Sequence, residues 1–275
     1  MKKTLRIGII GCGAIGSFLV KNIVNDQRFK IVGLIDEKSE RANKLAKLAR
    51  SGKSHIAVCQ DIHALLKSRP QAIVEVASPT AVEQYGPEVL RVCDLILMSV
   101  AAFVVKPGLF ESLGKVATRY GKRIYIPSGA ISGLDALSAL SPQLKEVMLE
   151  TTKHPKSIMQ TPYLDEKGVV LDKLQNKIVI FDGSAMEGAK YFPFNLNVAA
   201  ALSYAGIGPE KTHVRFVADP MAKCTTHKIT MKSPAGQIIT EAMNRPSPEN
   251  PRTSFLAALS VLSVLKQFVE PYCFM

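Results

Sequence analysis

A glycine-rich turn between an apolar run and a helix-forming stretch constrains the fold of this chain more than any other feature. The turn reads GCGAIG at residues 11–16 and follows the apolar run Ile7–Ile10. In such a turn Gly11 permits a tight reversal, Gly13 lets a pyrophosphate approach the backbone, and Gly16 lets the helix pack closely on the strand. The pattern predicts a strand, turn and helix that together bind phosphate.

The residues around the turn indicate that the phosphate belongs to a dinucleotide. Asp36 ends the next strand, twenty residues after Gly16, where a carboxylate accepts hydrogen bonds from both ribose hydroxyls and repels a 2′-phosphate. The start of the helix adds free backbone N–H groups that favour an anion. We therefore expect NAD as the cofactor. The predicted contacts in this region are Gly11, Gly13, Ala14, Ile15, Gly16 and Asp36.

Two basic residues keep NADP open as a second cofactor. Lys38 and Arg41 lie just past Asp36 and could meet a 2′-phosphate if its carboxylate turned aside. The alternative is that Arg41 begins a row of basic residues, spaced by three as far as Lys53, on a solvated helix face. We favour the solvated face, so NAD comes first and NADP second.

The first half of the chain alternates short buried strands with helices. Each apolar, β-branched run is short and bounded by turn residues, and the stretches between the runs are long enough for helices. The predicted strands are 5–10, 31–35, 72–76, 95–99 and 123–126, and the predicted helices are 14–24, 39–50 with Ser39 as N-cap, 80–92, and 107–120 with Pro107 in its first turn. This alternation predicts an α/β fold, a Rossmann-type doubly wound parallel sheet.

The pattern changes near Ile126, and the residues beyond it predict a second, α+β domain. The expected elements are strands at 214–217, 226–231 and 237–242, a turn at 233–236, a helix at 195–205, an irregular loop with three prolines at 244–251, and a buried helix from Thr253 to Val269, capped by Thr253 or Ser254. We expect the last helix to return to the first domain. The predicted domains are residues 1–126 with 252–275 for the dinucleotide, and residues 127–251 for catalysis and oligomerisation.

Two further strand ends are expected to border the cofactor, because ligands of open α/β sheets lie beyond the carboxyl ends of the strands. Ala77 and Ser78 follow the strand 72–76. Gly129 and Ala130 follow the strand 123–126 and are small enough to let a nicotinamide ring approach. The alternative for this second pair is a plain turn between domains, and the local sequence favours neither.

Composition restricts the class of protein. Five dispersed cysteines without a Cys-x-x-Cys pair indicate neither a disulfide framework nor a structural zinc, and we expect no metal. Glycines interrupt the apolar N-terminal stretch, which is a poor fit to a signal peptide, and no apolar run reaches the ~18 residues of a spanning helix. We expect a soluble cytoplasmic protein without a membrane partner. The net charge of +12 predicts an anionic ligand without choosing its class.

Hydride transfer also needs a proton acceptor, and histidine is the commonest such group. His55 and His63 flank a peripheral strand of the first domain and are interpreted as structural. The candidates in the second domain are His154, His213 and His227. His227 opens an alternating strand, but position alone does not choose among the three.

The chain resembles the L-aspartate dehydrogenase family over nearly its whole length. The matching segments are RIGIIGCGAIG at 6–16, PSGAISGLDAL at 127–137, FPFNLNVAAALSYAGIG at 192–208 and RPSPENPRTS at 245–254. The first is shared by many dehydrogenases, whereas the other three together are far more specific. By motif, the resemblance assigns cofactor contacts to Ala130 and Asn197 and the active-site histidine to His227.

The resemblance implies NAD(P)-dependent oxidation of L-aspartate to iminoaspartate. Water then hydrolyses the imine to oxaloacetate and ammonia, or a partner enzyme diverts it toward quinolinate and NAD biosynthesis. His227 would act as general acid and base. The two substrate carboxylates would need cationic or N–H donors, for which Lys153, His154, Lys190, Lys228 and Arg252 are available. A homodimer is the expected assembly, with quinolinate synthase as a functional partner.

Two alternatives compete with this interpretation. A two-domain sugar or polyol dehydrogenase would share the architecture, but such enzymes usually carry Glu-Lys-Pro where this chain has Val105-Lys106-Pro107. A nucleotide-sensing or nucleic-acid-binding module would use the positive charge without catalysis. It predicts basic clusters with interleaved aromatic residues, whereas the basic residues here are dispersed and Trp is absent. We therefore expect no nucleic acid partner.

Overall fold

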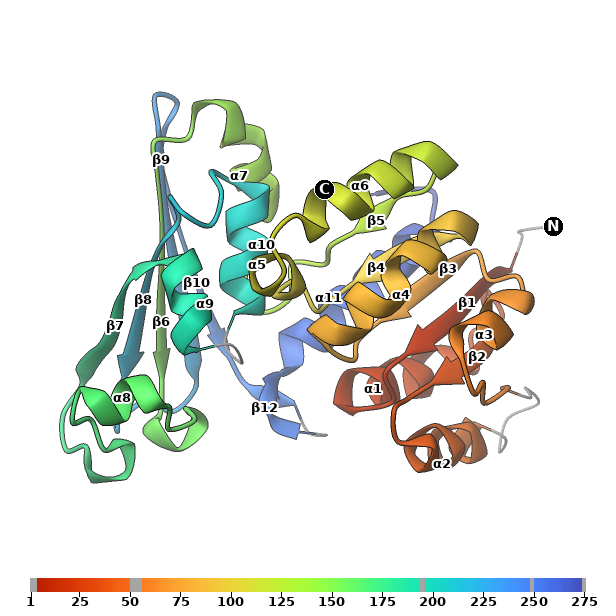
Figure 1. Cartoon of the computed structure of the whole chain (residues 1–275), viewed down its shortest axis with the longest axis horizontal. Coiled ribbons are helices and arrows are strands. Elements are labelled where there is room, and N and C mark those ends of the chain that lie inside the picture. Colours follow the sequence, from red (N-terminus) through yellow and green to blue (C-terminus); the bar gives the residue numbers. More distant parts are fainter. Residues whose placement is uncertain (1–3, 50–55, 193–195, 248–249, 274–275) are drawn as a thin grey trace. The chain divides into compact units, whose positions relative to one another are not determined.

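The computed structural model describes residues 4–49, 56–192, 196–247 and 250–273, and the chain divides into two compact units. Unit 1 comprises Met1–Pro127 and Ala257–Met275, and unit 2 comprises Ser128–Leu256. The predicted α/β fold class is confirmed, since a parallel sheet flanked by helices is joined to a second sheet-containing unit (Figure 1).

Unit 1 is built on a five-stranded parallel sheet of order β2-β1-β3-β4-β5. Its strands are β1 Leu5–Ile10, β2 Phe29–Ile35, β3 Ala72–Glu75, β4 Asp94–Leu97 and β5 Ile124–Tyr125. Its helices are α1 Ala14–Ile23, α2 Ser39–Ala49, α3 Ile62–Lys67, α4 Pro79–Val92, α5 Ala102–Val105, α6 Leu109–Tyr120 and α11 Phe255–Gln267. The strand order reverses direction between β1 and β3, which is where open sheets of this type bind ligands.

Helices cover both faces of this sheet because β1 alternates its side chains between them. Ile7 and Ile9 are fully buried in a core that includes Leu19 of α1 and Val261 of α11. On the opposite face, a Cβ on Gly8 would meet Leu65 of α3 at 2.9 Å. The sheet is therefore doubly wound, and its first strand is buried on both sides.

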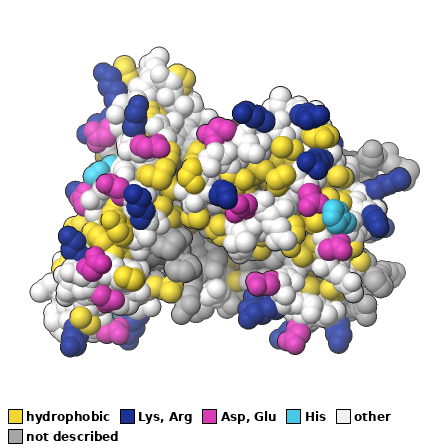
Figure 2. All heavy atoms as spheres, in the orientation of Figure 1, with side chains coloured by type: hydrophobic (Ala, Val, Ile, Leu, Met, Phe, Trp, Pro, Cys, Tyr) yellow, Lys and Arg dark blue, Asp and Glu magenta, His cyan; other side chains and the backbone are white. Residues whose placement is uncertain are grey.

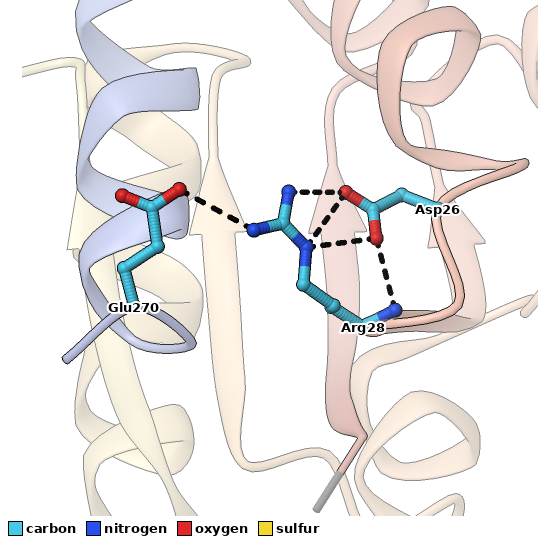
Figure 3. Close-up of polar contacts among 3 residues, drawn as sticks. All are labelled: Asp26, Arg28 and Glu270. Atoms are coloured by element: carbon cyan, nitrogen blue, oxygen red, sulfur yellow. Dashed lines mark hydrogen bonds and ion pairs between the residues drawn. The ribbon is translucent and has the colours of Figure 1, made fainter. Parts of the chain in front are cut away.

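The helix α11 lies more than 120 residues from the other elements of unit 1 in sequence but packs within its core. Beyond the end of α11, the Phe268 ring contacts Tyr125 of β5 with ring centres 4.8 Å apart. Arg28, just before β2, bridges Asp26 at 2.7 Å and Glu270 at 3.3 Å (Figure 3). These contacts place the last helix within unit 1.

Unit 2 carries a mixed five-stranded sheet of order β10-β9-β6-β8-β7, in which β6 and β8 are parallel and the other pairs are antiparallel. Its strands are β6 Glu146–Lys153, β7 Ile178–Ser184, β8 His213–Ala218, β9 Thr225–Ser233 and β10 Gly236–Asn244, followed by the small pair β11 Pro246–Ser247 and β12 Asn250–Ser254. Its helices are α7 Leu134–Leu140, α8 Pro162–Glu166, α9 Ala185–Tyr191 and α10 Asn197–Ala205, with short 3-10 turns at Ser141–Gln143, Pro155–Ser157 and Leu171–Lys173.

Two local predictions were wrong, and the start of the last helix was predicted to within two residues. The helix α6 begins at Leu109, because Gly108 with φ of +80° forms the preceding turn and leaves Pro107 outside the helix. The segment 244–251 is not wholly irregular, since Pro246–Ser247 pairs with Asn250–Ser254. A proline is tolerated there because a two-stranded pair is all edge and Pro246 is the first residue of its strand. The helix α11 begins at Phe255, after that strand pair ends.

Candidate active site

The glycine-rich turn has the geometry of a phosphate cradle. Gly11 has φ of +103°, and a Cβ on it would lie 2.7 Å from the Val76 carbonyl. A Cβ on Gly16 would lie 2.0 Å from the Gly11 carbonyl oxygen, so α1 packs against the turn through bare backbone. At Gly13 no atom of the described residues lies within 4 Å of a Cβ position. Two glycines are thus required by packing, and the third borders open space.

The open space at Gly13 suits a dinucleotide pyrophosphate. Gly13 is the N-cap of the ten-residue helix α1, and no side-chain hydrogen bond caps this end among the described residues. The first backbone N–H groups of α1, including those of Ala14 and Ile15, are the groups that a helix start offers to an anion. The residues present therefore fit an NAD-type cofactor at this turn.

Asp36 is fixed beside the same turn. Its Oδ2 accepts a hydrogen bond from the Cys12 N–H at 2.7 Å, and its Oδ1 accepts one from the Lys38 N–H at 2.9 Å. Each carboxylate oxygen keeps further acceptor capacity, which ribose hydroxyls can use. The carboxylate is therefore held beside the glycine-rich turn, and its contact with a ribose stays a prediction, whereas the side chains of Lys38 and Arg41 lie exposed.

The Cys12 thiol is structural. It is 5% exposed, and burial, together with the Asp36 carboxylate, raises its pKa to about 12. A thiol with so high a pKa is not ionised near neutrality and does not act as a nucleophile.

A buried glutamate, missed by the sequence reasoning, organises the strand ends next to the turn. Glu75, the last residue of β3, is 1% exposed. Its Oε1 accepts the N–H groups of Ala77 and Ser78 at 2.8 and 3.0 Å, and Ser99 donates its N–H to Oε2 and its hydroxyl to Oε1. Burial raises the pKa of Glu75. An acidic residue inside the apolar run 72–76 was the available signal.

The same interactions define how Ala77 and Ser78 can contact a cofactor. Their N–H groups are taken by Glu75, and the Ser78 hydroxyl caps α4 by accepting from the Ala81 N–H at 3.2 Å. Ala77 is exposed and Ser78 is half-buried. The predicted contact would therefore use their carbonyl groups, the O–H of Ser78 or their apolar surface.

In unit 2 a buried asparagine holds the segment of Ala130. Gly129 has φ of +64°, and Ala130 is 8% exposed. Asn244, at the end of β10, donates from Nδ2 to the Ala130 carbonyl at 2.9 Å and accepts the Ser254 hydroxyl at Oδ1 at 2.6 Å. The sequence reasoning placed Asn244 in a loop, so this role was missed.

Asn197 is the first residue of α10 and is exposed. Residues 193–195 of its motif lie outside the described residues. The orientation of Ala130 and Asn197 toward a cofactor therefore stays a prediction from the motif.

His227 lies inside unit 2. It is 6% exposed on β9 and pairs in register with Thr151 of β6, whose Oγ1 is 3.0 Å from His227 Nδ1. Burial, and secondly the charge of Lys153, lowers the pKa of His227 to about 3. The ring is therefore neutral near pH 7. Its Nδ1 is engaged by Thr151, so a further hydrogen-bond partner would meet the ring at Nε2.

The remaining predicted histidines and cations are distributed differently. His63 lies exposed on α3, with its Nδ1 3.3 Å from a Glu88 carboxylate oxygen. His213 pairs with Asp182 on the exposed side of β8. Lys190 and Lys228 are exposed. His55 lies outside the described residues, as does the side chain of Arg252.

Lys153 differs from these cations because it lies within unit 2, next to His227. It is partly buried at the end of β6, two residues beyond Thr151 on the same face of the strand. Burial lowers its pKa to about 8. Among the side chains that the structure describes, Lys153 is the cation whose charge lowers the pKa of His227.

In the part of the chain that the structure describes, no three His, Cys, Asp or Glu side chains are grouped so that they could hold a metal ion. None of the described helices has the length and hydrophobicity of a membrane-spanning helix. Lys and Arg side chains are interspersed with Asp and Glu on both units on the face shown in Figure 2.

Comparisons with known proteins agree with the two-unit organisation. Residues 11–127 match the family described as "Homoserine dehydrogenase, NAD binding domain", and residues 135–268 match "Aspartate dehydrogenase, C-terminal". The L-aspartate dehydrogenases of Methanosarcina mazei and Methanococcoides burtonii are 39% and 40% identical to the chain, covering 97% of it and 98% of their own length.

The solved structures are consistent with these sequence matches. The crystal structure of aspartate dehydrogenase from Thermotoga maritima covers 99% of this chain and all of its own, with a TM-score of 0.78 at 28% identity. A scyllo-inositol dehydrogenase from Lactobacillus casei has a TM-score of 0.58 at 11% identity, which shows a shared fold alone. The resemblance inferred from the motifs is thereby confirmed, and with relatives this similar over nearly its whole length, the chain belongs to the L-aspartate dehydrogenase family.

Proposed function

We propose that this protein oxidises L-aspartate to iminoaspartate with NAD as the preferred hydride acceptor and NADP as a second one. The observation that carries the proposal is the match to L-aspartate dehydrogenases over 97% of the chain, together with a cofactor cradle in unit 1 and a buried neutral histidine in unit 2. The imine then hydrolyses to oxaloacetate and ammonia or passes to quinolinate and NAD biosynthesis, with quinolinate synthase as the functional partner.

The residues of unit 1 would hold the cofactor. The turn at Gly11, Gly13 and Gly16 leaves room for the pyrophosphate, and Asp36 would accept the ribose hydroxyls. We extend this set by motif to Ala130 and Asn197, and by position to Ala77 and Ser78. Once bound, NAD supplies the ring carbon that accepts the hydride.

The residues of unit 2 would remove a proton from the substrate ammonium group. Hydride leaves Cα only when the substrate amine is neutral, so the ammonium group must first lose a proton to a base. His227 would accept it at Nε2, directly or through water, and return it to solvent. In the free protein its low pKa disfavours this step, but the negative charge of a bound dicarboxylate favours the imidazolium form. Substrate binding would thus prepare the base.

An assay of the purified protein with L-aspartate and each cofactor tests the proposal. Reduced cofactor should accumulate with NAD, and more slowly with NADP. A His227→Ala variant should keep its affinity for NADH and lose turnover by ~10²–10⁴-fold, the usual contribution of a general base. His63→Ala, an exposed histidine in unit 1, is the matched control and should behave like the unmodified protein. Turnover of another amino acid without turnover of L-aspartate would contradict the substrate assignment.

The domain roles, the assembly and the compartment are part of the same proposal. Residues 1–126 with 252–275 would bind the dinucleotide, and residues 127–251 would carry catalysis and oligomerisation. Five free cysteines fit the reducing cytoplasm.

A homodimer would use the outward face of the unit 2 sheet, where Ile239 and Met243 of β10 are 53% and 70% exposed. The charged row Glu241, Lys228 and Glu150 crosses three paired strands on that face and could pair with its own copy. Sedimentation analysis of the protein should show a dimer, and Met243→Lys should shift it toward monomer. A monomer at micromolar concentration would contradict this part of the proposal.

A further inference from the structure

The proposed function leaves one feature of unit 2 unexplained. This feature is a small pocket near His227 that is lined by the cation Lys153. The pocket belongs wholly to unit 2, and Thr151 and Lys153 of β6 form its polar side. Its other walls are Ile158, Ile180, Phe192, Phe216 and Val217. In the sheet, β6 lies between β9, which carries His227, and β8, which carries Phe216 (Figure 1).

The apolar walls of this pocket are held in place by aromatic packing. The rings of Phe192 and Phe216 meet edge to face with centres 5.3 Å apart, and both side chains are almost fully buried. Phe181 packs against both of them. Such contacts fix the shape of the pocket and keep it poorly solvated. A charged group that enters it would therefore depend on Lys153 for compensation.

The strand register brings Lys153 close to the proposed base. Thr151 is directly opposite His227 in the antiparallel pair, and Lys153 lies two residues further along β6 on the same face. Diagonal neighbours of this kind are ~7–8 Å apart, within reach of a long side chain. In keeping with this register, the charge of Lys153 contributes to the lowered pKa of His227.

We propose that Lys153 binds one carboxylate of the dicarboxylate substrate in this pocket and so determines the preference for an acidic amino acid. The assignment rests on the proposed function and names the specificity residue within it. An ammonium in an apolar pocket is suited to a carboxylate, because the charge-assisted hydrogen bond is shielded from water. It also places the substrate beside His227, whose Nε2 is the proposed proton acceptor.

Binding would also change the charge seen by His227. In the free protein the positive charge of Lys153 lowers the pKa of His227. A carboxylate on Lys153 neutralises that charge, which makes the imidazolium form less unfavourable. Only a substrate with the second carboxylate would do this, so substrate recognition and base strength would be linked through Lys153.

Succinate binding tests the assignment without depending on catalysis. Titration calorimetry of the protein saturated with NADH would compare succinate with butyrate, a monocarboxylate of the same chain length. Lys153→Met should weaken succinate binding by ~10–100-fold, the effect of losing a hydrogen bond to a charged group, and should remove most of the preference over butyrate. Lys173→Met, the same change at an exposed lysine of unit 2, should leave both affinities unchanged.

The steady-state kinetics of the same variants separate failure of this inference from failure of the proposed function. Lys153→Met should raise KM for L-aspartate by the same factor and leave the affinity for NADH intact, which also shows that the variant is folded. If the unmodified protein oxidises L-aspartate and Lys153→Met keeps its KM and its succinate affinity, the assignment to Lys153 is wrong while the function stands. If the unmodified protein neither oxidises L-aspartate nor binds succinate, the proposed function itself fails.

A charge-preserving variant supplies a second, pH-based measurement. With a pKa of about 8 in the free protein, Lys153 loses its charge as pH rises through that value, so succinate affinity should fall above it. Lys153→Arg should bind succinate with little change between about pH 7 and pH 9.5, since a guanidinium stays protonated there. Equal pH dependence in the two proteins would count against the assignment.

Other titratable side chains on the surrounding segments make contacts of their own. Asp219, just past β8, accepts the Met221 N–H, and Asp182 of β7 binds His213 and Arg215. Glu187 forms the capping box of α9, and His154, next to Lys153, accepts the Lys156 N–H at Nδ1. His227 itself is neutral throughout the range because its pKa is about 3.

Discussion

At the scale of single residues, Thr151 is the side chain that orients the proposed base. Its hydroxyl lies 3.0 Å from His227 Nδ1, and both groups are buried. If the hydroxyl oxygen accepts from Nδ1–H, the lone pair is on Nε2, and the ring is poised to take a proton there. Because both groups are buried, water does not take the place of either hydrogen-bond partner. The contact therefore sets both the rotamer and the tautomer of the His227 ring.

Replacement of this hydroxyl should impair turnover more than binding. Thr151→Val leaves a buried imidazole nitrogen without its partner, at a free-energy cost of ~1–3 kcal/mol, and the value of kcat should fall by ~10–100-fold while NADH affinity is kept. Thr151→Ser should restore most of the rate because it restores the hydroxyl. Equal rates for Val and Ser variants in steady-state assays would mean that Thr151 has only a packing role.

Two glycines of the same turn should respond differently to the same methyl group. Gly13→Ala should fold normally, because no described atom lies within 4 Å of the new Cβ, but it should weaken NADH binding by filling the space proposed for the pyrophosphate. Gly16→Ala places its Cβ 2.0 Å from the Gly11 carbonyl oxygen and should lower the free energy of unfolding as well. Urea unfolding and NADH titration of both variants measure the contrast. Similar stability losses in the two would contradict it.

At the scale of elements, α6 shows how glycine can be either required or dispensable. Gly108 and Gly121 flank the helix with φ of +80° and +61°, which L side chains rarely adopt. Gly114 is inside the helix, and no described atom lies within 4 Å of a Cβ there. The conformational freedom of Gly114 therefore lowers the free energy of unfolding, and no turn at this position requires a glycine.

Gly114→Ala should accordingly stabilise the protein. Alanine is favoured over glycine inside a helix by ~0.8–1 kcal/mol, which corresponds to a rise in Tm of ~2–4 °C for a protein of comparable size. Gly121→Ala is the contrasting variant and should lower Tm. Thermal unfolding by circular dichroism measures both, and a lower Tm for Gly114→Ala would show that the space at this position is not available.

The elements also show which parts of the fold can be predicted from sequence. The strand β1 was predicted with its observed bounds, because a buried parallel strand is a continuous apolar run. The strand β6 was missed, since its end, Glu150-Thr151-Thr152-Lys153, places polar side chains on both faces. Two of those polar residues, Thr151 and Lys153, belong to the proposed site, so the hydrophobic pattern fails to predict a strand at the residues that carry the chemistry.

Contacts between distant segments were the other part that sequence patterns could not supply. Glu75 and Ser99 meet because β3 and β4 are neighbours in the sheet, and Asn244 meets Ala130 across more than one hundred residues. Sequence motifs pointed to Asp36 as a candidate cofactor contact and to His227 as a candidate active-site histidine. The partners that orient them become visible only when the strands are paired.

At the scale of the whole molecule, the structure shows where the residues behind the net charge of +12 lie. The residues that would meet anionic ligands are few, and in unit 2 Lys153 is partly buried. Much of the basic excess lies instead on exposed surfaces such as those of Lys190 and Lys228. The charge therefore indicated an anionic ligand without locating its site.

The completeness of unit 1 depends on α11, which is supplied from the far end of the chain. Val261 is fully buried in the core of that unit, whereas Leu259 on the same helix is 39% exposed. Val261→Ala should lower the free energy of unfolding by roughly 1–3 kcal/mol, since it removes buried methyl groups and leaves a cavity. Leu259→Ala should have a smaller effect, and urea denaturation measures both. Equal losses would mean that α11 is not anchored through Val261.

The discontinuity of unit 1 has a consequence for synthesis of the protein on the ribosome. The chain leaves unit 1 at Pro127 and re-enters it at Ala257, so 129 residues of unit 2 are made in between. At typical translation speeds of ~5–20 residues per second this takes roughly 6–26 s. During that interval the nascent parallel sheet lacks α11, and the side chains that this helix covers are exposed to water. The first segment to be translated is thus among the last to reach its finished fold, and it is the segment that chaperones would have most time to bind.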